Sequence, residues 1–290
     1  MQYIGEIYRP PSEAKSLILQ LTVGCSHNRC TFCGVYKNKR FTIRPYEDIK
    51  ADIDEVSRYG ILPRVFLADA DALITPMRKI VPVLEYMNKK IIGLERVGIY
   101  ANAKGILKKS VEDLQELKAL RLGIIYLGVE TGDQLILDKV KKGTTVEKLI
   151  EASHRVKDAG IKLSVTVLLG LGGVEKSKEH ALATAKILSR IDPDYAGALT
   201  VMVYEFSEIY KEVQEGTLKL PDPFQTLEEL RTMISDSHFT HCFFTSNHAS
   251  NYLPIRVWMP EEKVKTLEMI DNVINSRDEN LLRPESLRAI

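Results

Sequence analysis

The 290-residue chain is predicted to adopt an α/β fold with parallel strands. Two observations support this prediction. Short apolar segments of strand length alternate along the chain with longer amphipathic segments of helix length, as they do in βα units. Several of the short segments are apolar throughout and rich in β-branched residues, which is typical of strands covered on both faces. Six such units suggest either a doubly wound sheet or an incomplete barrel.

Six strands and the helices that follow them are expected at defined places. The strands are Ser16–Val23, Arg64–Ala68, Arg96–Ala101, Gly123–Val129, Lys162–Leu169 and Tyr195–Val203. The helices are Pro45–Tyr59, Pro76–Lys89, Val111–Leu120, Thr145–Ala159, Lys176–Arg190 and Thr226–Ser235. Ser110 and Thr145 are the expected N-caps, and Gly60 and Gly160 are expected just past the ends of their helices.

The alternation stops in the last quarter of the chain, where prolines interrupt it at 221, 223 and 254. A final helix is predicted there over Glu261–Ser276, packed against the core. We therefore expect an N-terminal extension over residues 1–15, a core over 16–210 and a C-terminal extension over 211–290.

The composition excludes several classes of protein. Hydrophobic residues make up 44% and charged residues 27% of the chain, which fits a globular protein rather than a disordered one. A formal charge of +1 does not favour nucleic acid as a partner. The apolar runs are shorter than the roughly 20 residues of a membrane helix, and Met1–Pro11 lacks the apolar core of a secretory signal. We expect a cytoplasmic protein with no membrane partner.

Three of the four cysteines, Cys25, Cys30 and Cys33, lie close together in the pattern C-x4-C-x2-C, with Gly24 and Gly34 beside them. A disulfide framework distributes its cysteines to join distant loops, whereas clustered cysteines in a reducing compartment are typical of metal ligands. The loop follows the first predicted strand, at the carboxyl edge of the sheet where α/β folds place their chemistry.

Two kinds of metal centre fit this loop. A structural zinc site takes four ligands and would need His27 or a distant residue such as Cys242. An iron–sulfur cube also takes four ligands, but three cysteines would leave one iron open to another ligand. The spacing favours iron–sulfur over zinc, and three unliganded thiols are the remaining alternative.

The cysteine loop, with Phe32 before its last cysteine, resembles that of the radical S-adenosylmethionine (radical SAM) superfamily, although the commonest spacing there is one residue shorter. The segments Phe66–Leu73, Gly128–Gly132 and Leu168–Gly173 resemble the superfamily segments that meet the methionine amino group, the ribose and the adenine. The resemblance extends from about residue 16 to 205, and within the superfamily it is to the branch labelled anaerobic coproporphyrinogen-oxidase-like, whose substrate is uncertain.

This resemblance implies a partial (β/α)6 TIM-like barrel with a C-terminal helical extension. It also implies a [4Fe–4S] cluster that reductively cleaves S-adenosylmethionine (SAM), giving a 5′-deoxyadenosyl radical that abstracts hydrogen from a substrate, here unidentified. Such an enzyme would be an oxidoreductase or a transferase and would need an electron donor such as flavodoxin or ferredoxin. The basic residues Lys37, Lys39, Arg40 and Arg44 would face that donor or an anionic substrate, or would line a solvated loop.

The chemistry of SAM indicates which residue types would bind it. The three cysteines would hold the cluster, with Phe32 beside them. The remaining candidates are Asp69 and Asp71 for the ammonium, Glu130 for the ribose, Arg155 and Lys157 for the carboxylate, Asn102 for the nucleoside, and Gly170 for the adenine. Each also has an ordinary structural explanation, such as a helix cap, a turn or a solvated helix face.

Two further residues are candidates for the chemistry itself. His248 lies in the polar segment 246–252 and would act as an acid or base, and Cys242 would quench a substrate radical. A hydrogen-bonded loop and a buried structural cysteine are the alternatives. The competing function for the whole chain is a non-catalytic, regulatory protein that binds zinc or an iron–sulfur cluster.

Overall fold

The structure is a computed structural model, and it describes residues 1–289. The chain divides into two compact units. The first unit comprises Met1–Asn28, Val35–Leu127 and Glu151–Leu163, and the second comprises Arg29–Gly34, Gly128–Ile150 and Ser164–Ile290. The predicted boundaries at residues 16 and 211 stay a prediction.

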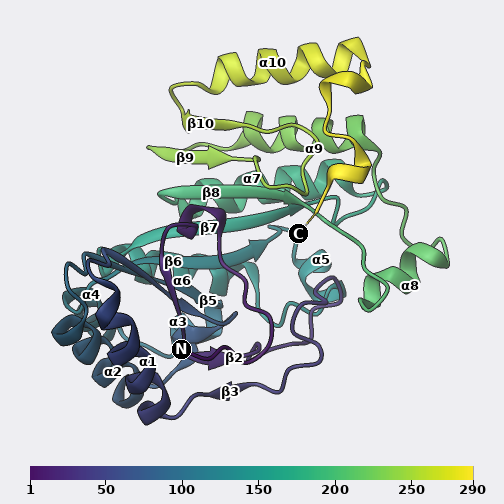
Figure 1. Cartoon of the computed structure of the whole chain (residues 1–290). Helices are drawn as coiled ribbons and strands as arrows, with labels where there is room; N and C mark the ends of the chain where they lie inside the picture. Colours follow the sequence, from purple (N-terminus) through teal and green to yellow (C-terminus); the bar gives the residue numbers. More distant parts are fainter. Residues whose placement is uncertain (290) are drawn as a thin grey trace. The chain divides into compact units, whose positions relative to one another are not determined.

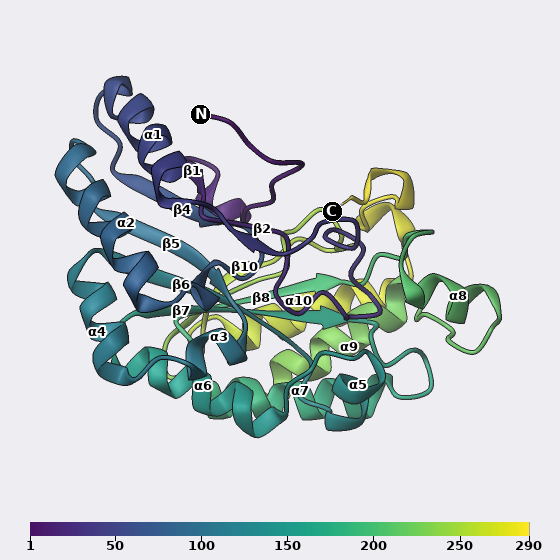
Figure 2. The same ribbon diagram turned by 90° about the horizontal axis from the view of Figure 1, so that it is seen from below.

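The first unit contains a ladder of parallel strands. Its strands, in order of pairing, are β1 (Leu17–Gln20), β4 (Arg64–Ala68), β5 (Arg96–Ala101) and β6 (Leu122–Glu130), the last of which continues into the second unit. Its helices are α1 (Tyr46–Val56), α2 (Met77–Lys90), α3 (Ala103–Leu107), α4 (Val111–Ala119) and most of α6 (Val146–Asp158). Figures 1 and 2 show α1 and α2 side by side along the ladder.

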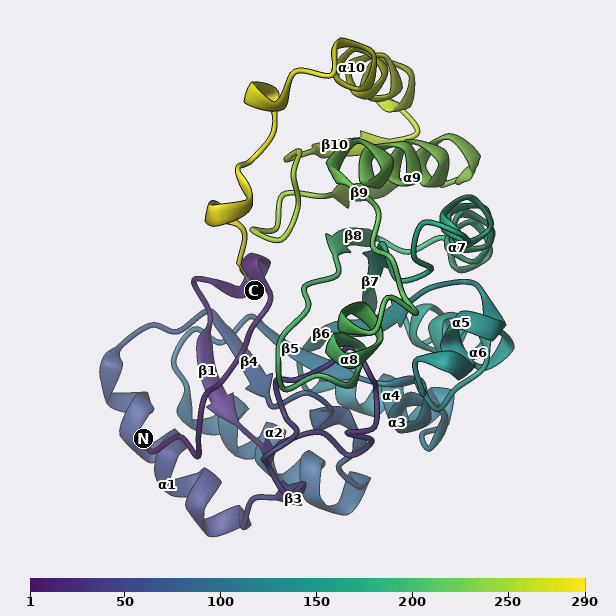
Figure 3. The ribbon, with the colours of Figure 1, turned by 90° about the vertical axis from the view of Figure 1, so that its right-hand side faces the viewer.

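The second unit contains a ladder of both parallel and antiparallel strands. Its strands are β7 (Lys162–Leu169), whose first two residues belong to the first unit, β8 (Tyr195–Thr200), β9 (Cys242–Thr245) and β10 (Arg256–Met259), of which only the β9–β10 pair is antiparallel. Its helices are α5 (Gln134–Lys139), α7 (Ser177–Ile191), α8 (Glu208–Gln214), α9 (Pro223–Asp236) and α10 (Lys263–Ser276). In Figure 3, α7, α9 and α10 follow one another along this unit.

The predicted α/β class is confirmed, and a strand forms in each of the six predicted segments, with two corrections. The strand predicted over Tyr195–Val203 ends at Thr200. The segment Ser16–Val23 is not one strand, because β1 ends at Gln20 and β2 (Thr22–Val23) pairs instead with β3 (Thr42–Ile43). The change occurs at Leu21, whose N–H donates to Ala68 O and whose carbonyl accepts from Arg44 N–H. An apolar run predicts extended backbone but does not specify which neighbour pairs with each half.

Local signals at the helix ends are confirmed. Ser110 caps α4 in a reciprocal capping box with Asp113. Thr145 Oγ1 accepts the Lys148 N–H at 3.3 Å before α6. Gly60 and Gly160 have φ values of +93° and +71°, in the left-handed region that glycine enters without strain.

The basic residue Arg44 is buried rather than solvated. Its Nη1 donates to Asp52 Oδ2 at 2.7 Å and to Gln20 O at 2.9 Å, so it joins α1 to the end of β1. Neither a donor protein nor a substrate is needed to explain this arginine. No helix within residues 1–289 has the length and apolar character needed to cross a membrane.

Candidate functional site

The cysteine loop begins directly after β2. Gly24 has a φ of +75°, and a Cβ there would lie 3.1 Å from the Lys39 carbonyl oxygen, so the close approach of backbone favours glycine. Asn28 Nδ2 donates to Tyr36 O at 2.7 Å and closes this part of the loop. Cys25 belongs to the first unit and is partly exposed.

The rest of the loop belongs to the second unit, where two backbone hydrogen bonds hold Thr31. Its N–H donates to Val140 O, and its carbonyl accepts from Ile209 N–H, both at 3.0 Å. Phe32 packs against an apolar cluster that includes Val140 and Ile209, and a Cβ at Gly34 would overlap the ring of Phe206. The backbone that carries Cys30 and Cys33 is therefore anchored to the ends of α5 and α8.

The donor set of the loop suits an iron–sulfur cluster. Cys25, Cys30 and Cys33 are all partly exposed, and none of them forms a disulfide. Thiolates are the ligands that such clusters take in proteins. As the structure stands, residues 1–289 contain no group of three or more His, Cys, Asp and Glu side chains placed to hold a metal ion.

Asp69 follows β4 and is fully buried. Its Oδ2 accepts the Gly24 N–H at 3.1 Å and a bond from Gln20 Nε2 at 3.4 Å, so it supports the start of the cysteine loop. Its Oδ1 is buried without a hydrogen-bond partner. Burial raises the pKa of this carboxyl, against the opposing bond from Gly24. An unused buried acceptor fits a cationic ligand group such as the SAM ammonium.

Asp71 is used differently, because both of its oxygens accept hydrogen bonds from the chain. Oδ1 accepts the Asn102 N–H at 3.1 Å, and Oδ2 accepts Asn102 Nδ2 at 2.7 Å and the Ser26 hydroxyl. Burial raises the pKa of Asp71 to about 6. The structure thus brings together Asp71, Asn102 and the residue next to Cys25. Asn102 also caps α3, since its Oδ1 accepts the Gly105 N–H at 2.7 Å.

Lys109 is a buried residue near this cluster that the sequence analysis missed. Its Nζ donates to Leu73 O at 2.7 Å and to Thr75 O at 3.0 Å. Burial lowers the pKa of its ammonium to about 8, with Asp71 and Asp113 opposing the shift. A lysine outside any motif gives no signal in the sequence that it will be buried.

This pKa predicts how stability depends on pH. Between pH 8 and 10.5, Lys109 is protonated to a greater extent in the unfolded chain than in the folded chain. The free energy of unfolding therefore rises with pH over this range. Relative to Lys109→Met, which cannot titrate, the wild type should gain roughly 2 kcal/mol between pH 8 and 9.5. Urea unfolding at the two pH values measures this gain. Lys108 is exposed, so the wild type should show no such gain in the free energy of unfolding relative to Lys108→Met. An equal gain relative to both variants would contradict the prediction.

The remaining cofactor candidates of the second unit lie at the end of β6 and just after β7. Glu130 ends β6 and is largely buried, and its Oε1 accepts a hydrogen bond from Lys142 Nζ at 2.6 Å. Gly170 follows β7 with a φ of +81° and begins a turn closed by the Gly173 N–H on Gly170 O at 3.1 Å. The carboxylate and the turn stay candidates for ribose and adenine.

Arg155 and Lys157 lie half-buried on α6. Arg155 Nη1 donates to Leu107 O at 3.1 Å and to Lys109 O at 2.7 Å, and Nη2 donates to Glu151 at 2.8 Å. The guanidinium therefore joins α6 to the carbonyl end of α3. Its role toward a SAM carboxylate stays a prediction, as does that of Lys157.

His248 and Cys242 lie in the C-terminal part of the second unit. Cys242 is fully buried at the start of β9. His248 Nδ1 accepts the Ser250 N–H at 3.2 Å, and burial, followed by the charge of Arg283, lowers the pKa of the imidazole. The segment 246–252 contacts the end of β8, because Asn251 Nδ2 donates to Ala198 O at 2.8 Å. Their roles in chemistry stay predictions.

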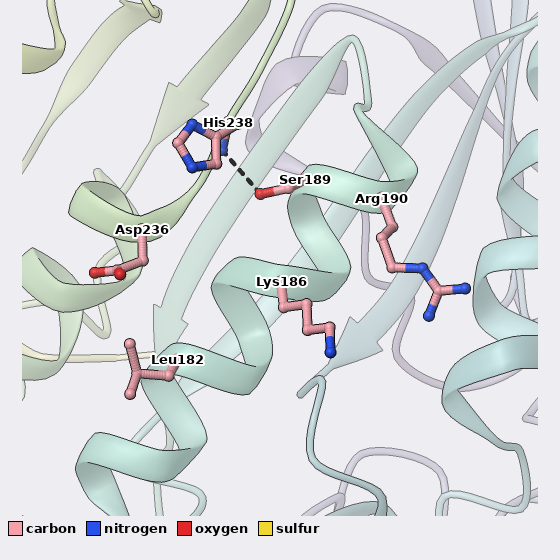
Figure 4. Close-up of a pocket in the computed structure, with 6 residues that line it drawn as sticks. All are labelled: Leu182, Lys186, Ser189, Arg190, Asp236 and His238. Atoms are coloured by element: carbon pink, nitrogen blue, oxygen red, sulfur yellow. Dashed lines mark hydrogen bonds between the residues drawn. The ribbon is translucent and has the colours of Figure 1, made fainter.

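A surface pocket of the second unit involves none of these candidates. It lies between α7 and the end of α9, and His238 N–H donates to Ser189 Oγ at 2.8 Å beside it (Figure 4). Its lining residues are Leu182, Lys186, Ser189, Arg190, Asp236 and His238. The carboxylate of Asp236 among two cations gives the pocket a mixed charge.

Comparison with known proteins assigns the chain to a family. The sequence profile of the radical SAM superfamily matches residues 19–185. The chain is 27% identical over 210 residues to the anaerobic magnesium-protoporphyrin IX monomethyl ester cyclase of Rubrivivax gelatinosus, covering 70% of this chain and 36% of the cyclase. It is 27% identical over 191 residues to a tRNA-2-methylthio-N(6)-dimethylallyladenosine synthase of Dehalococcoides mccartyi, covering 64% and 44%. The chain thus spans less than half the length of these curated relatives.

Solved structures show the same fold. Coproporphyrinogen III oxidase from Escherichia coli, a radical SAM enzyme, superposes with a TM-score of 0.57 at 16% identity, over 76% of this chain and 51% of the oxidase. The radical SAM methyltransferase TsrM from Kitasatospora setae, solved with cobalamin and a [4Fe–4S] cluster, has a TM-score of 0.56 at 16% identity, over 69% and 39%. The predicted fold class is confirmed.

Radical SAM enzymes use a [4Fe–4S] cluster and SAM, act on a substrate and need a reductant. The cysteine loop, Asp69 and the Gly170 turn all lie inside the matched residues. Because the profile covers more than half of the sequence, the chain belongs to the radical SAM superfamily.

Proposed function

We propose that the chain is a radical SAM enzyme that acts on a substrate not yet identified. The observation that carries this proposal is the C-x4-C-x2-C loop, which directly follows a strand and lies within the residues that match the superfamily. When bound, the cluster and SAM supply a 5′-deoxyadenosyl radical that abstracts a hydrogen atom from the substrate.

The residues of the chain would bind and orient these groups. Cys25, Cys30 and Cys33 hold the cluster through three thiolates and leave its fourth iron without a cysteine ligand. Asp69 offers its unpartnered buried Oδ1 to the SAM ammonium. Glu130 accepts from the ribose hydroxyls, and the Gly170 turn lets backbone approach the adenine closely.

The partners follow from this chemistry. A low-potential protein such as flavodoxin or ferredoxin would supply the electron, and a reducing compartment such as the cytoplasm would keep the three thiols available. The near-neutral charge does not favour nucleic acid as the substrate. The reaction would be that of an oxidoreductase or a transferase.

Anaerobic reconstitution with iron and sulfide tests the proposal. After reduction with dithionite and addition of SAM, we expect at least one equivalent of 5′-deoxyadenosine per protein, measured by liquid chromatography. Omitting dithionite should abolish the product, because cleavage needs the electron. A colourless protein that holds one zinc and forms no 5′-deoxyadenosine would instead support the regulatory alternative.

A further inference from the structure

Glu229, in α9, lies far along the chain from every cofactor candidate but contacts the Gly170 turn. Its side chain is fully buried, and its Oε1 accepts the Gly170 N–H at 2.7 Å. The same oxygen accepts from His180 Nδ1 at 3.0 Å, and Oε2 accepts the Ser177 hydroxyl at 2.5 Å. One carboxylate thus joins the end of β7 to the first turn of α7.

The Gly170 N–H depends on this acceptor. Gly170 directly follows β7, and its φ of +81° departs from the extended conformation of that strand. The acceptor of its N–H is the Glu229 carboxylate rather than the backbone of another strand. A buried N–H without an acceptor costs free energy comparable to a lost hydrogen bond. A Cβ at Gly170 would lie 3.3 Å from Val201 and 3.4 Å from Pro221, so the turn is also closely packed.

The other end of the turn is held by the same part of the chain. Val174 N–H donates to Lys219 O at 2.8 Å. A Cβ at Gly173 would lie 2.7 Å from Leu218 and 3.0 Å from the Lys219 carbonyl oxygen. Residues 218–229 therefore fix both ends of the turn, although they follow it by some 50 positions.

His180 contributes to the hydrogen bonds around Glu229 through only one of its two ring nitrogens. Because a carboxylate only accepts, the Nδ1 of His180 carries the proton that it shares with Glu229. The Nε2 of the same ring is buried and has no hydrogen-bond partner among residues 1–289. The ring thus serves the network through Nδ1 alone.

We propose that Glu229 is a positioning residue that presets the backbone of the Gly170–Gly173 turn for the adenosine part of SAM. This inference rests on the proposed function, since it takes that turn as the adenine site. A turn already held in its binding conformation loses less conformational freedom when the ligand binds, and the affinity is correspondingly higher. The segment after residue 211 then takes part in cofactor binding without touching the cofactor.

Glu229→Ala tests this proposal, with Glu228→Ala as the matched exposed control. Equilibrium dialysis of SAM against the reconstituted, unreduced protein gives Kd without turnover. We expect Glu229→Ala to raise Kd about tenfold, the equivalent of one lost hydrogen bond. Amide hydrogen exchange on the protein without cluster should show faster exchange over residues 170–174. Glu229→Gln keeps an acceptor for Gly170 and should stay within about threefold of the wild type.

A pair of His180 variants gives a second test that does not remove the carboxylate. His180→Asn places an amide N–H close to where Nδ1 lies, whereas His180→Gln places it close to the position of Nε2. Both lose the ring, so a merely structural role would affect them alike. We expect His180→Asn to keep its Kd within about threefold and His180→Gln to raise it about tenfold.

The outcomes separate this inference from the proposed function. A reconstituted wild type that binds no SAM would overturn both. A wild type that binds SAM, with Glu229→Ala and Glu228→Ala equal in Kd, would overturn the positioning role alone. If Glu229→Ala does not fold, the His180 pair decides, and equal Kd values for its two members would overturn the inference.

Discussion

Replacing Cys30 with alanine should abolish 5′-deoxyadenosine formation, lowering it at least about 100-fold, as expected when a catalytic centre is lost. Three thiolates are the whole protein ligand set proposed for the cluster, so two would leave a second iron without a protein ligand. Iron and sulfide content and the visible absorbance of the reconstituted protein should fall together with activity. The same result is expected for Cys25→Ala and Cys33→Ala.

Cys242→Ala is the matched control for this loss. Cys242 is buried at the start of β9, so its replacement should cost some stability but leave iron content and SAM cleavage near those of the wild type. If Cys30→Ala kept its colour, its iron and its nucleoside product, the cluster assignment would be wrong. Equal iron loss in Cys242→Ala would also count against a site confined to the loop.

Replacing Glu13 with alanine should destabilise the protein by roughly 2–4 kcal/mol, because it leaves buried and half-buried donors, one of them charged, without their acceptor. The Glu13 side chain is fully buried, and its Oε1 accepts from Arg96 Nη2 and Tyr126 OH, each at 2.6 Å. Its Oε2 accepts the Ser16 hydroxyl. Alanine would leave these three donors without their acceptor.

Urea or thermal unfolding measures this loss, with Glu6→Ala as the control. Glu6 is exposed, and its carboxylate accepts the hydroxyl of Tyr8, two residues away, at 2.8 Å. Its replacement should change the free energy of unfolding by less than about 0.5 kcal/mol. A Glu13→Ala protein within about 1 kcal/mol of the wild type would show that the buried network contributes little.

Much of the fold could be predicted because its signals are local. Three strands have the predicted bounds, namely Arg64–Ala68, Arg96–Ala101 and Lys162–Leu169. A short apolar run of strand length between turn residues is typical of a buried strand, which is why these bounds could be predicted. The strands β9 and β10 were missed, because they have only four residues each. The pairing of β9 depends on β8, which lies far before it in the chain, and β10 in turn pairs with β9.

In the candidate site, too, some features could be predicted from local sequence and others depended on the folded structure. The three cysteines and the acidic segment after β4 could be found from residue type, spacing and position after a strand. The different uses of Asp69 and Asp71 could not, because they depend on which oxygens meet Gly24, Ser26 and Asn102. Residue type states what a side chain can bind, whereas burial and neighbours determine what it does bind.

The amino-acid sequence alone thus predicted the parallel βα units, the cysteine loop and the family to which the chain belongs. The partners of the buried polar groups were settled by folding. Glu13 reaches Tyr126, and Glu229 reaches Gly170, across separations of 113 and 59 residues. No local pattern encodes such pairs, because a buried charge must be satisfied by whatever donors the packed elements bring to it.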